Sequence, residues 1–258
     1  MSFDFEVVSD IGTTRETNQD SVCIHSADTL VGEVIFGAVC DGMGGLTNGE
    51  FASQSMIQKL EQWFYTELPI LISEGIEQNK LKSSLENILV QQNEVLIHIG
   101  NAKESPMGTT ISAILILPGR YFGIHVGDSR IYEIKKRQIL QVTNDHSRVM
   151  QEVRLGIITP TQAQRDERKN ELLQCIGVRG KIVPEFFEGV VKQDTTFVLC
   201  SDGFVHKICN KDIWKNLRPN KTRKTGVLSR KLKQLVEINK ARLETDNITA
   251  LAIRVTGK

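Results

Sequence analysis

Short apolar runs rich in β-branched residues recur along this chain, and only a few polar residues separate many neighbouring runs. The strongest runs are residues 34–40, 110–117, 121–126, 129–134, 196–200 and 248–255, and the weaker ones are residues 5–9, 21–25 and 139–143. Runs of this length and composition predict β-strands. Residues 118–120 and 135–138 are hairpin-turn signals between such runs. Because parallel neighbours need long crossovers, strands joined by short turns predict antiparallel sheets.

Apolar residues at helical spacing predict two long helices in the first half of the chain and a third near its end. The three apolar faces consist of Met56, Ile57, Leu60, Trp63 and Phe64; of Leu81, Leu85, Ile88, Leu89, Leu96 and Ile99; and of Leu228, Leu232, Leu235 and Val236. Residues 47–50 have capping-box spacing just before the first helix.

Helices placed between groups of antiparallel strands predict an α+β fold. We expect two antiparallel β-sheets packed as a central sandwich, with helices flanking it on the outside. The chain has 258 residues and shows neither a repeat nor a linker. A single domain over residues 1–258 is therefore the simplest expectation.

Two polar segments depart from the strand and helix patterns. Residues 147–175 are rich in Arg, Gln, Glu and Asp and are interrupted by Gly156 and Pro160. This segment is expected to form a flap of short helices on the surface, of the kind that often borders an active site. Residues 207–242 carry many Lys and Arg. A solvated basic helix face is the favoured interpretation, and a docking surface for an acidic or phosphorylated partner is the alternative.

Composition excludes several classes of protein. The net charge of +1 indicates neither a nucleic-acid partner nor an anionic membrane surface. No apolar stretch approaches the roughly 18 residues that a membrane span needs. The first ten residues lack the features of a signal peptide, so a cytoplasmic location is expected. The five cysteines are scattered without a Cys-x-x-Cys pair, which argues against a zinc or redox site.

Aspartates stand where predicted strands begin or end. Asp41, Asp128 and Asp202 each follow an apolar run, and Asp246 immediately precedes one. Several carboxylates brought close together repel and raise one another's pKa, and bound divalent cations would offset that repulsion. Oxygen ligands without a cluster of Cys or His favour Mg²⁺ or Mn²⁺ over zinc. One Asp-Gly pair alone would indicate only a turn, but the set predicts a metal centre.

The order and spacing of these motifs resemble those of the metal-dependent protein phosphatases (the type 2C serine/threonine phosphatases) in their bacterial form. The resemblance runs nearly end to end and rests on residues 10–20, 39–45, 49–53, 107–110, 126–130, 143–147, 173–177, 199–203 and 246–249. Members of this family fold as an antiparallel β-sandwich flanked by helices, which agrees with the pattern described above. Residues 147–175 correspond to the family's flap.

The resemblance also implies a role for each site residue. Asp41 would bridge two metal ions, and the carbonyl of Gly42 would bind one of them. Asp202 and Asp246 would hold the other ion, and Asp20 would act through bound water. Asp128, together with Asp202, would contribute to a third, weaker metal position. Arg15 would grip the substrate phosphate, because its planar fork of donors matches phosphate oxygens.

The implied activity is hydrolysis of phosphoserine and phosphothreonine in proteins. Two or three Mn²⁺ or Mg²⁺ ions would be the cofactors, and a water or hydroxide bridging two of them would attack phosphorus directly. Phosphorylated proteins would be the substrates, and a serine/threonine kinase would counteract the enzyme.

Three positions depart from the family's pattern. Met43 stands where many eukaryotic relatives carry a histidine suspected as the general acid, so the proton donor is undefined. Gln19 replaces a common Glu and removes one charge from around the site. Asp166 and Glu167 replace a His-Pro pair in the flap, which leaves the flap's conformation open.

Rival interpretations are a haloacid-dehalogenase-type phosphatase, a silent phosphoprotein-binding relative and a nucleic-acid-binding protein. The first would need a second Asp at position 43, the second would usually have lost metal carboxylates, and the third would need more aromatics beside Trp214. His25, His98, His125 and His206 are interpreted as structural, because no partner carboxylate stands at ligand spacing from them in the sequence. His146 is interpreted as a helix-start or hinge residue.

Overall fold

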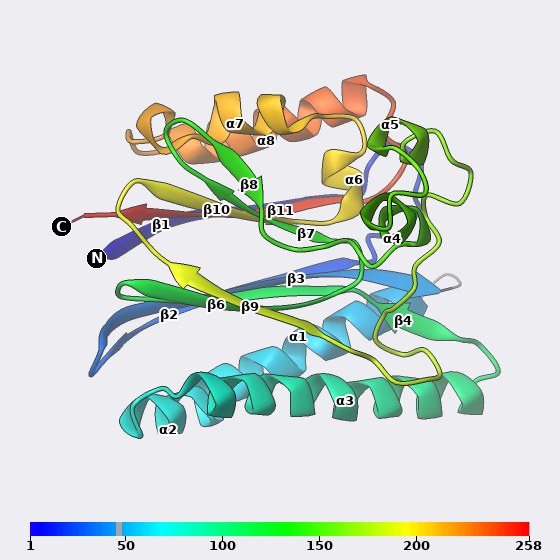
Figure 1. Cartoon of the computed structure of the whole chain (residues 1–258), viewed down its shortest axis with the longest axis horizontal. Coiled ribbons are helices and arrows are strands. Elements are labelled where there is room, and N and C mark those ends of the chain that lie inside the picture. Colours follow the sequence, from blue (N-terminus) through cyan, green and yellow to red (C-terminus); the bar gives the residue numbers. More distant parts are fainter. Residues whose placement is uncertain (45–47, 258) are drawn as a thin grey trace.

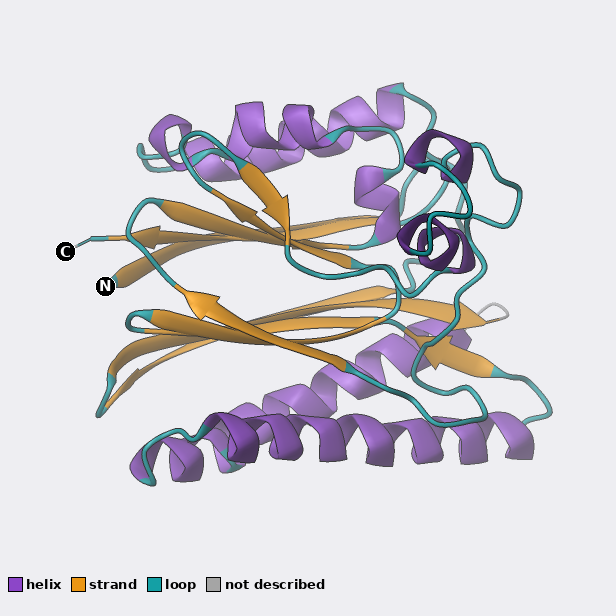
Figure 2. Ribbon diagram, in the orientation of Figure 1, coloured by secondary structure: helices purple, strands orange, loops and turns teal. Residues whose placement is uncertain are grey.

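The computed structural model describes residues 1–44 and 48–257. Two antiparallel sheets are stacked face to face, and helices cover the outer face of each sheet (Figure 1). Figure 2 shows the same four layers, helix, sheet, sheet and helix, coloured by type of element. This arrangement confirms the predicted α+β sandwich.

The first sheet has the strand order β1-β11-β10-β7-β8. Its strands are β1 (Ser2–Asp10), β7 (Arg130–Ile134), β8 (Ile139–Gln141), β10 (Thr195–Cys200) and β11 (Ile248–Thr256). The helices on this side are α6 (Asp202–Val205), α7 (Asn210–Leu217), the 3-10 turn η1 (Pro219–Lys221) and α8 (Val227–Ala241).

The second sheet has the order β2-β3-β5-β6-β9, with β4 paired to the end of β3. Its strands are β2 (Asp20–Thr29), β3 (Gly32–Gly44), β4 (Met107–Thr109), β5 (Ile111–Leu117), β6 (Arg120–Val126) and β9 (Glu185–Val190). Three helices cover its outer face: α1 (Asn48–Thr66), α2 (Leu68–Ser73) and α3 (Gln78–Ala102).

Side-chain alternation along the strands builds three apolar layers. On β3, the side chains of Val34, Phe36, Ala38 and Cys40 pack with α1 and α3, whereas those of Ile35 and Val39 pack between the sheets. The same alternation on β11 directs Leu251 and Ile253 to the space between the sheets and Ala250 and Ala252 to the helices. Buried on both faces, such strands read as continuous apolar runs, which is why the sequence displays them so clearly.

The predicted helix faces are confirmed. Met56, Leu60 and Trp63 of α1 are buried in the layer that Leu81, Leu85 and Leu89 of α3 share, and the predicted face of α8 is buried over the first sheet. The cap predicted at residues 47–50 begins at Thr47, which lies outside the described residues. No helix in the described part of the chain is both long and apolar enough to cross a membrane.

The flap leaves the sandwich after β8 and returns at β9. It contains α4 (Arg148–Arg154) and α5 (Pro160–Ala163), and Gly156 separates the two helices with a positive φ of 71°. Thr159 caps α5, and Pro160 occupies its first turn. In Figure 1, α4, α5 and α6 lie together at the end of the sandwich opposite both termini. The predicted surface excursion of short helices is therefore confirmed.

Candidate active site

Five aspartates from distant parts of the sequence meet at the flap end of the sandwich. Asp20, the first residue of β2, is paired in register with Asp41 near the end of β3. The Asp41 carboxyl group is within hydrogen-bond reach of Asp202, at the start of α6. It also interacts electrostatically with the carboxyl groups of Asp20, Asp128 and Asp246. The structure thus brings together all five predicted carboxylates.

Close backbone packing holds two of these carboxylates side by side. A Cβ atom on Gly203 would lie 2.1 Å from the carbonyl oxygen of Asn247 and 3.3 Å from Cβ of Asp246. Only glycine permits the turn after Asp202 to approach the turn at Asp246 this closely. Gly42 shows a similar approach, since its Cβ would lie 2.0 Å from the carbonyl oxygen of Gly49. The glycines that follow Asp41 and Asp202 are therefore required by packing around the site.

Burial and mutual repulsion disfavour the charged forms of three of these carboxylates. Burial, reinforced by neighbouring aspartates, raises the pKa of Asp20 to about 7 and the pKa of Asp128 to about 8. The same causes raise the pKa of Asp41 well above its usual range. Several buried carboxylates therefore need a cation or protons near neutral pH.

Two oxygen atoms indicate where a cation fits. Oδ1 of Asp20 and Oδ1 of Asp202 are buried and accept no hydrogen bond within the described part of the chain. An unsatisfied buried carboxylate oxygen is costly, and a hard divalent cation is the partner that several such oxygens would share. The donor set present here therefore fits Mg²⁺ or Mn²⁺.

Hydroxyl groups fix the carboxylates in place. Thr110 Oγ1 accepts a hydrogen bond from the Asp41 amide at 2.9 Å and lies 2.6 Å from Oγ of Ser129, in the turn that follows Asp128. On the other side of the site, Ser201 Oγ donates to Asp20 Oδ2 at 2.8 Å. These buried contacts orient the aspartates before any ligand arrives.

Arg15 lies at the rim of this cluster and is paired with Asp246. Its Nε and Nη2 donate to the two carboxylate oxygens of Asp246 at 2.9 and 2.8 Å. Half of the Arg15 side chain is exposed (51%), and it lines a cavity of about 490 Å³ together with Thr17, Gln19 and Thr245. These contacts raise the pKa of Arg15, so its guanidinium stays charged.

Asn247 fixes the loop that carries Arg15. Its Oδ1 accepts from the Gln19 amide at 2.9 Å, and its Nδ2 donates to the carbonyl oxygens of Ile11 at 2.9 Å and Thr17 at 3.0 Å. One side chain thereby satisfies three backbone groups of residues 11–19. The sequence motif contained Asn247, but sequence reasoning assigned it no role.

The interpretation of His206 as a residue without a carboxylate partner is wrong. Its Nε2 lies 3.2 Å from Asp202 Oδ2, and its Nδ1 lies 3.5 Å from Glu244 Oε1. Burial alone would lower the pKa of His206, but the two carboxylates raise it to about 10. Burial would likewise raise the pKa of Asp202, yet contact with His206 lowers it. The available signal was the spacing of four residues between Asp202 and His206, which places both on one face of a helical turn.

The other histidines have different surroundings. His25 has a carboxylate partner from a distant part of the sequence, because its Nε2 lies 3.1 Å from Glu61 Oε1. His146 accepts a hydrogen bond from the Gly127 amide at 3.2 Å and donates its own amide to the Gly127 carbonyl. These two bonds fasten the flap entrance to the turn that carries Asp128, which agrees with a hinge position.

Asp166, one of the two flap positions that differ from the family's pattern, forms an ion pair. Asp166 pairs with Arg168 at 2.8 Å, and Arg168 pairs with Glu152 of α4 at 3.0 Å. Ion pairs between its own residues therefore stabilise the flap.

Met43, the third position that differs from the family's pattern, pairs with Gly108 between β3 and β4. Its side chain packs there and offers no acidic proton.

Comparison with known proteins identifies the family. Residues 13–238 match the family model described as protein phosphatase 2C. The serine/threonine phosphatase stp of Listeria monocytogenes serotype 4b is 30% identical over 248 residues, which cover 96% of this chain and 94% of that protein.

Two solved structures have the same architecture. The serine/threonine phosphatase Stp1 from Staphylococcus aureus superposes with a TM-score of 0.86 at 28% identity, covering all of this chain and 96% of that one. The catalytic domain of the serine threonine protein phosphatase PstP, solved in complex with two manganese ions, superposes with a TM-score of 0.79 at 25% identity over 99% of both chains. By its sequence motifs, its fold and these matches, this chain belongs to the protein phosphatase 2C family.

Proposed function

We propose that this chain is a metal-dependent protein phosphatase that hydrolyses phosphoserine and phosphothreonine, with one catalytic domain over residues 1–258. The observation that carries the proposal is the convergence of five aspartates, of which Asp20 and Asp202 each keep a buried, unsatisfied oxygen in the described structure. The relatives named above are serine/threonine phosphatases, which supports the same reaction.

The aspartates would hold two or three Mn²⁺ or Mg²⁺ ions. Asp41 would bind two of the ions, and the carbonyl group of Gly42 would bind one of these. Asp202 and Asp246 would hold the other ion, and Asp20 would act through bound water. Asp128 would support a third position. When bound, such ions supply an activated water and neutralise charge on the phosphoryl oxygens. The catalytic domain of PstP was solved with two manganese ions, which supports a site for two such ions in this chain.

The chain's own residues would orient the substrate. Arg15 would exchange its contact with Asp246 for the phosphate oxygens, because the same planar fork of donors matches both groups. Asn247 would keep the Arg15 loop in place during that exchange. Thr110 and Ser201 would hold the carboxyl groups of Asp41 and Asp20 in position, so little reorganisation would accompany reaction.

The alternatives are weaker for specific reasons. Because the chain belongs to the protein phosphatase 2C family, the haloacid-dehalogenase hypothesis is rejected. That chemistry also needs a second Asp as an acid at position 43, where this chain has Met43. A silent relative would usually have lost metal carboxylates, whereas all five meet here. A counteracting serine/threonine kinase and a cytoplasmic site of action also belong to this proposal.

Metal-dependent turnover is the direct test. We expect the purified chain to hydrolyse an aryl phosphate and a phosphothreonine peptide with Mn²⁺ or Mg²⁺, and a chelator to reduce both rates to background. The reason is that uncatalysed phosphate-monoester hydrolysis is extremely slow, so residual carboxylates alone cannot sustain it. Phosphate release measured with and without chelator provides the readout. A metal-saturated protein without turnover on either substrate would contradict the proposal.

The Arg15→Ala substitution tests phosphate binding. We expect KM for a phosphothreonine peptide to rise by about tenfold to a hundredfold, as for loss of charged hydrogen bonds, with a smaller change in kcat. Arg15→Lys keeps the charge but loses the planar guanidinium group, and its KM should lie between those of the wild type and Arg15→Ala. Competitive inhibition by inorganic phosphate should weaken in parallel. An unchanged KM in Arg15→Ala would remove Arg15 from substrate binding.

A further inference from the structure

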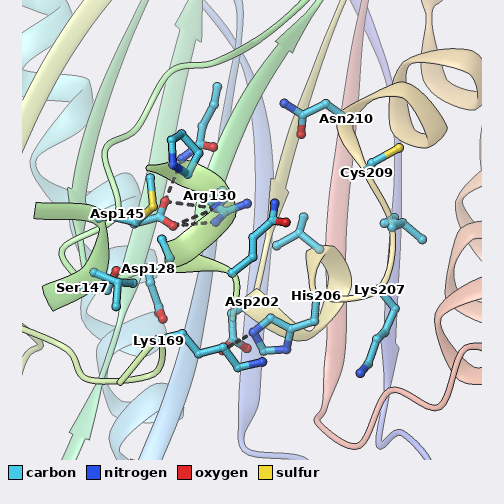
Figure 3. A pocket seen from close by; sticks show the side chains of 18 of the residues that line it. Asp128, Arg130, Asp145, Ser147, Lys169, Asp202, His206, Lys207, Cys209 and Asn210 are labelled. Atoms are coloured by element: carbon cyan, nitrogen blue, oxygen red, sulfur yellow. Dashed lines mark hydrogen bonds and ion pairs between the residues drawn. The ribbon is translucent and has the colours of Figure 1, made fainter. Parts of the chain in front are cut away.

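A wide cleft separates the flap from α6 and the segment that leads into α7. Its volume is about 1200 Å³. Asp128 and Asp202 are among its lining residues, and we call the part of the cleft that they line its floor. Figure 3 shows Lys169 of the flap reaching toward the floor near Asp202 and His206, and Lys207 on the other wall. Any substrate segment that approaches Asp202 from this side must pass between these walls.

The cations that line the cleft fall into two groups. Arg130 is neutralised by Asp145 at 2.6 Å, and Arg242 is neutralised by Asp212 at 3.1 Å. Protonated His206 is likewise paired, with Asp202 and Glu244. The remaining lining cations are Arg165 and Lys169 on the flap wall and Lys207 and Lys211 on the opposite wall. Among the residues that the structure describes, these four have no carboxylate partner, and all four are exposed.

The acidic lining residues do not balance these four charges. Asp145 and Asp212 are already paired, and Asp128 and Asp202 belong to the metal site on the floor. Once bound metal ions neutralise Asp128 and Asp202 on the floor, the walls carry a surplus of about four positive charges. This surplus is enough to attract an acidic ligand at ordinary ionic strength. Charge complementarity therefore favours an acidic occupant.

We propose that this cleft selects acidic substrate segments, in which Asp, Glu or a second phosphorylated residue flanks the phosphothreonine or phosphoserine. This inference rests on the proposed phosphatase function and specifies its substrate class. The phosphoryl group binds at the aspartate cluster, because Asp202 lines the cleft floor and also interacts electrostatically with Arg15. The flanking acidic side chains contact Arg165 and Lys169 on one wall or Lys207 and Lys211 on the other. It also assigns a role to the first part of the basic segment at residues 207–242.

The test compares three phosphothreonine peptides of equal length. One carries three Glu before the phosphothreonine, one carries three Glu after it, and one carries Gln at all of these positions. At low salt we expect kcat/KM for at least one acidic peptide to exceed that for the Gln peptide by about tenfold, because several weak exposed ion pairs add up. Raising the salt concentration to about 0.5 M should remove most of this preference.

Charge-reversed variants locate the preference. Lys207→Glu/Lys211→Glu and Arg165→Glu/Lys169→Glu should each reduce the ratio of kcat/KM between acidic and Gln peptides toward one, and Lys207→Gln/Lys211→Gln should reduce it partly. The matched control is Lys192→Glu/Lys233→Glu, which makes the same charge change at exposed positions outside the cleft. That control should keep the wild-type ratio.

The outcomes separate this inference from the proposed function. Turnover of all peptides with a ratio near one in the wild type would overturn the acidic preference while leaving the phosphatase intact. Equal loss of preference in the control and in the cleft variants would also overturn it, because the effect would then reflect net charge alone. Failure to turn over any peptide would overturn the proposed function, and this inference with it.

Discussion

Asp41→Asn will abolish turnover, lowering kcat on a phosphothreonine peptide by roughly a thousandfold or more, since metal centres supply several kcal/mol to such reactions. The substitution keeps the shape of the side chain and removes its charge. Asp41 occupies the centre of the cluster, opposite Asp20 in the β2–β3 pairing and in contact with Asp202.

The same variant should fold at least as well as the wild type without metal. Burial and four neighbouring aspartates raise the pKa of Asp41, so loss of this carboxyl removes repulsion. Thermal unfolding in chelator measures this, and steady-state kinetics with saturating Mn²⁺ measures kcat. Asp28→Asn, on the same hairpin but opposite Glu33 at its far end, is the matched control and should keep wild-type activity. Retained turnover in Asp41→Asn would eliminate its bridging role.

The fold could be predicted because most of its strands have a recognisable local sequence pattern. Strands such as β3, β5 and β11 are buried on both faces and therefore consist of continuous apolar residues. β9 was not predicted because it is a half-exposed edge strand that contains Glu185 and Glu188 within six residues. The helices α6 and α7 were not predicted either, because a helix of four to eight residues is too short to show helical periodicity.

The site was predictable only in part, for a different reason. The sequence shows that the aspartates stand at strand ends. It does not show that Asp20 lies opposite Asp41, because that pairing depends on the register between β2 and β3. The contact of His206 with Glu244 joins residues from α6 and the turn before β11, and no local pattern connects them. The cleft is similar: Lys169 and Lys207 face one space only because the flap folds back over α6.

Without metal, the protein should lose stability as pH rises from about 6.5 to about 8, and Mn²⁺ should reverse that loss. Burial raises the pKa of Asp20 to about 7 and the pKa of Asp128 to about 8. An unfolded Asp has a pKa of about 3.9, so in this window the folded state binds protons that the unfolded state has released. Stability falls with pH wherever the folded state binds more protons.

Two histidines also affect how stability depends on pH, and they explain why the decline is measured above about pH 6.5. Burial lowers the pKa of His125 to about 3, so the unfolded state binds the extra proton at this residue below about pH 6.5. That contribution makes stability rise with pH and opposes the aspartates, but it ends near pH 6.5. His206 acts with the aspartates, because its pKa of about 10 contributes stability that is complete below about pH 6.5 and is lost as pH rises.

Thermal unfolding in chelator at pH 6.5, 7.2 and 8.0 should show Tm falling by roughly 10 °C, since each kcal/mol shifts Tm by about 2–4 °C in a protein of this size. Saturating Mn²⁺ should raise Tm most at pH 8.0, because cations displace the protons that the aspartates hold at lower pH. Asp128→Asn removes one of the titrating carboxyls and should flatten the decline. If the metal-free Tm stays constant or rises across this range, the carboxylates are not the repelling cluster on which the catalytic proposal depends.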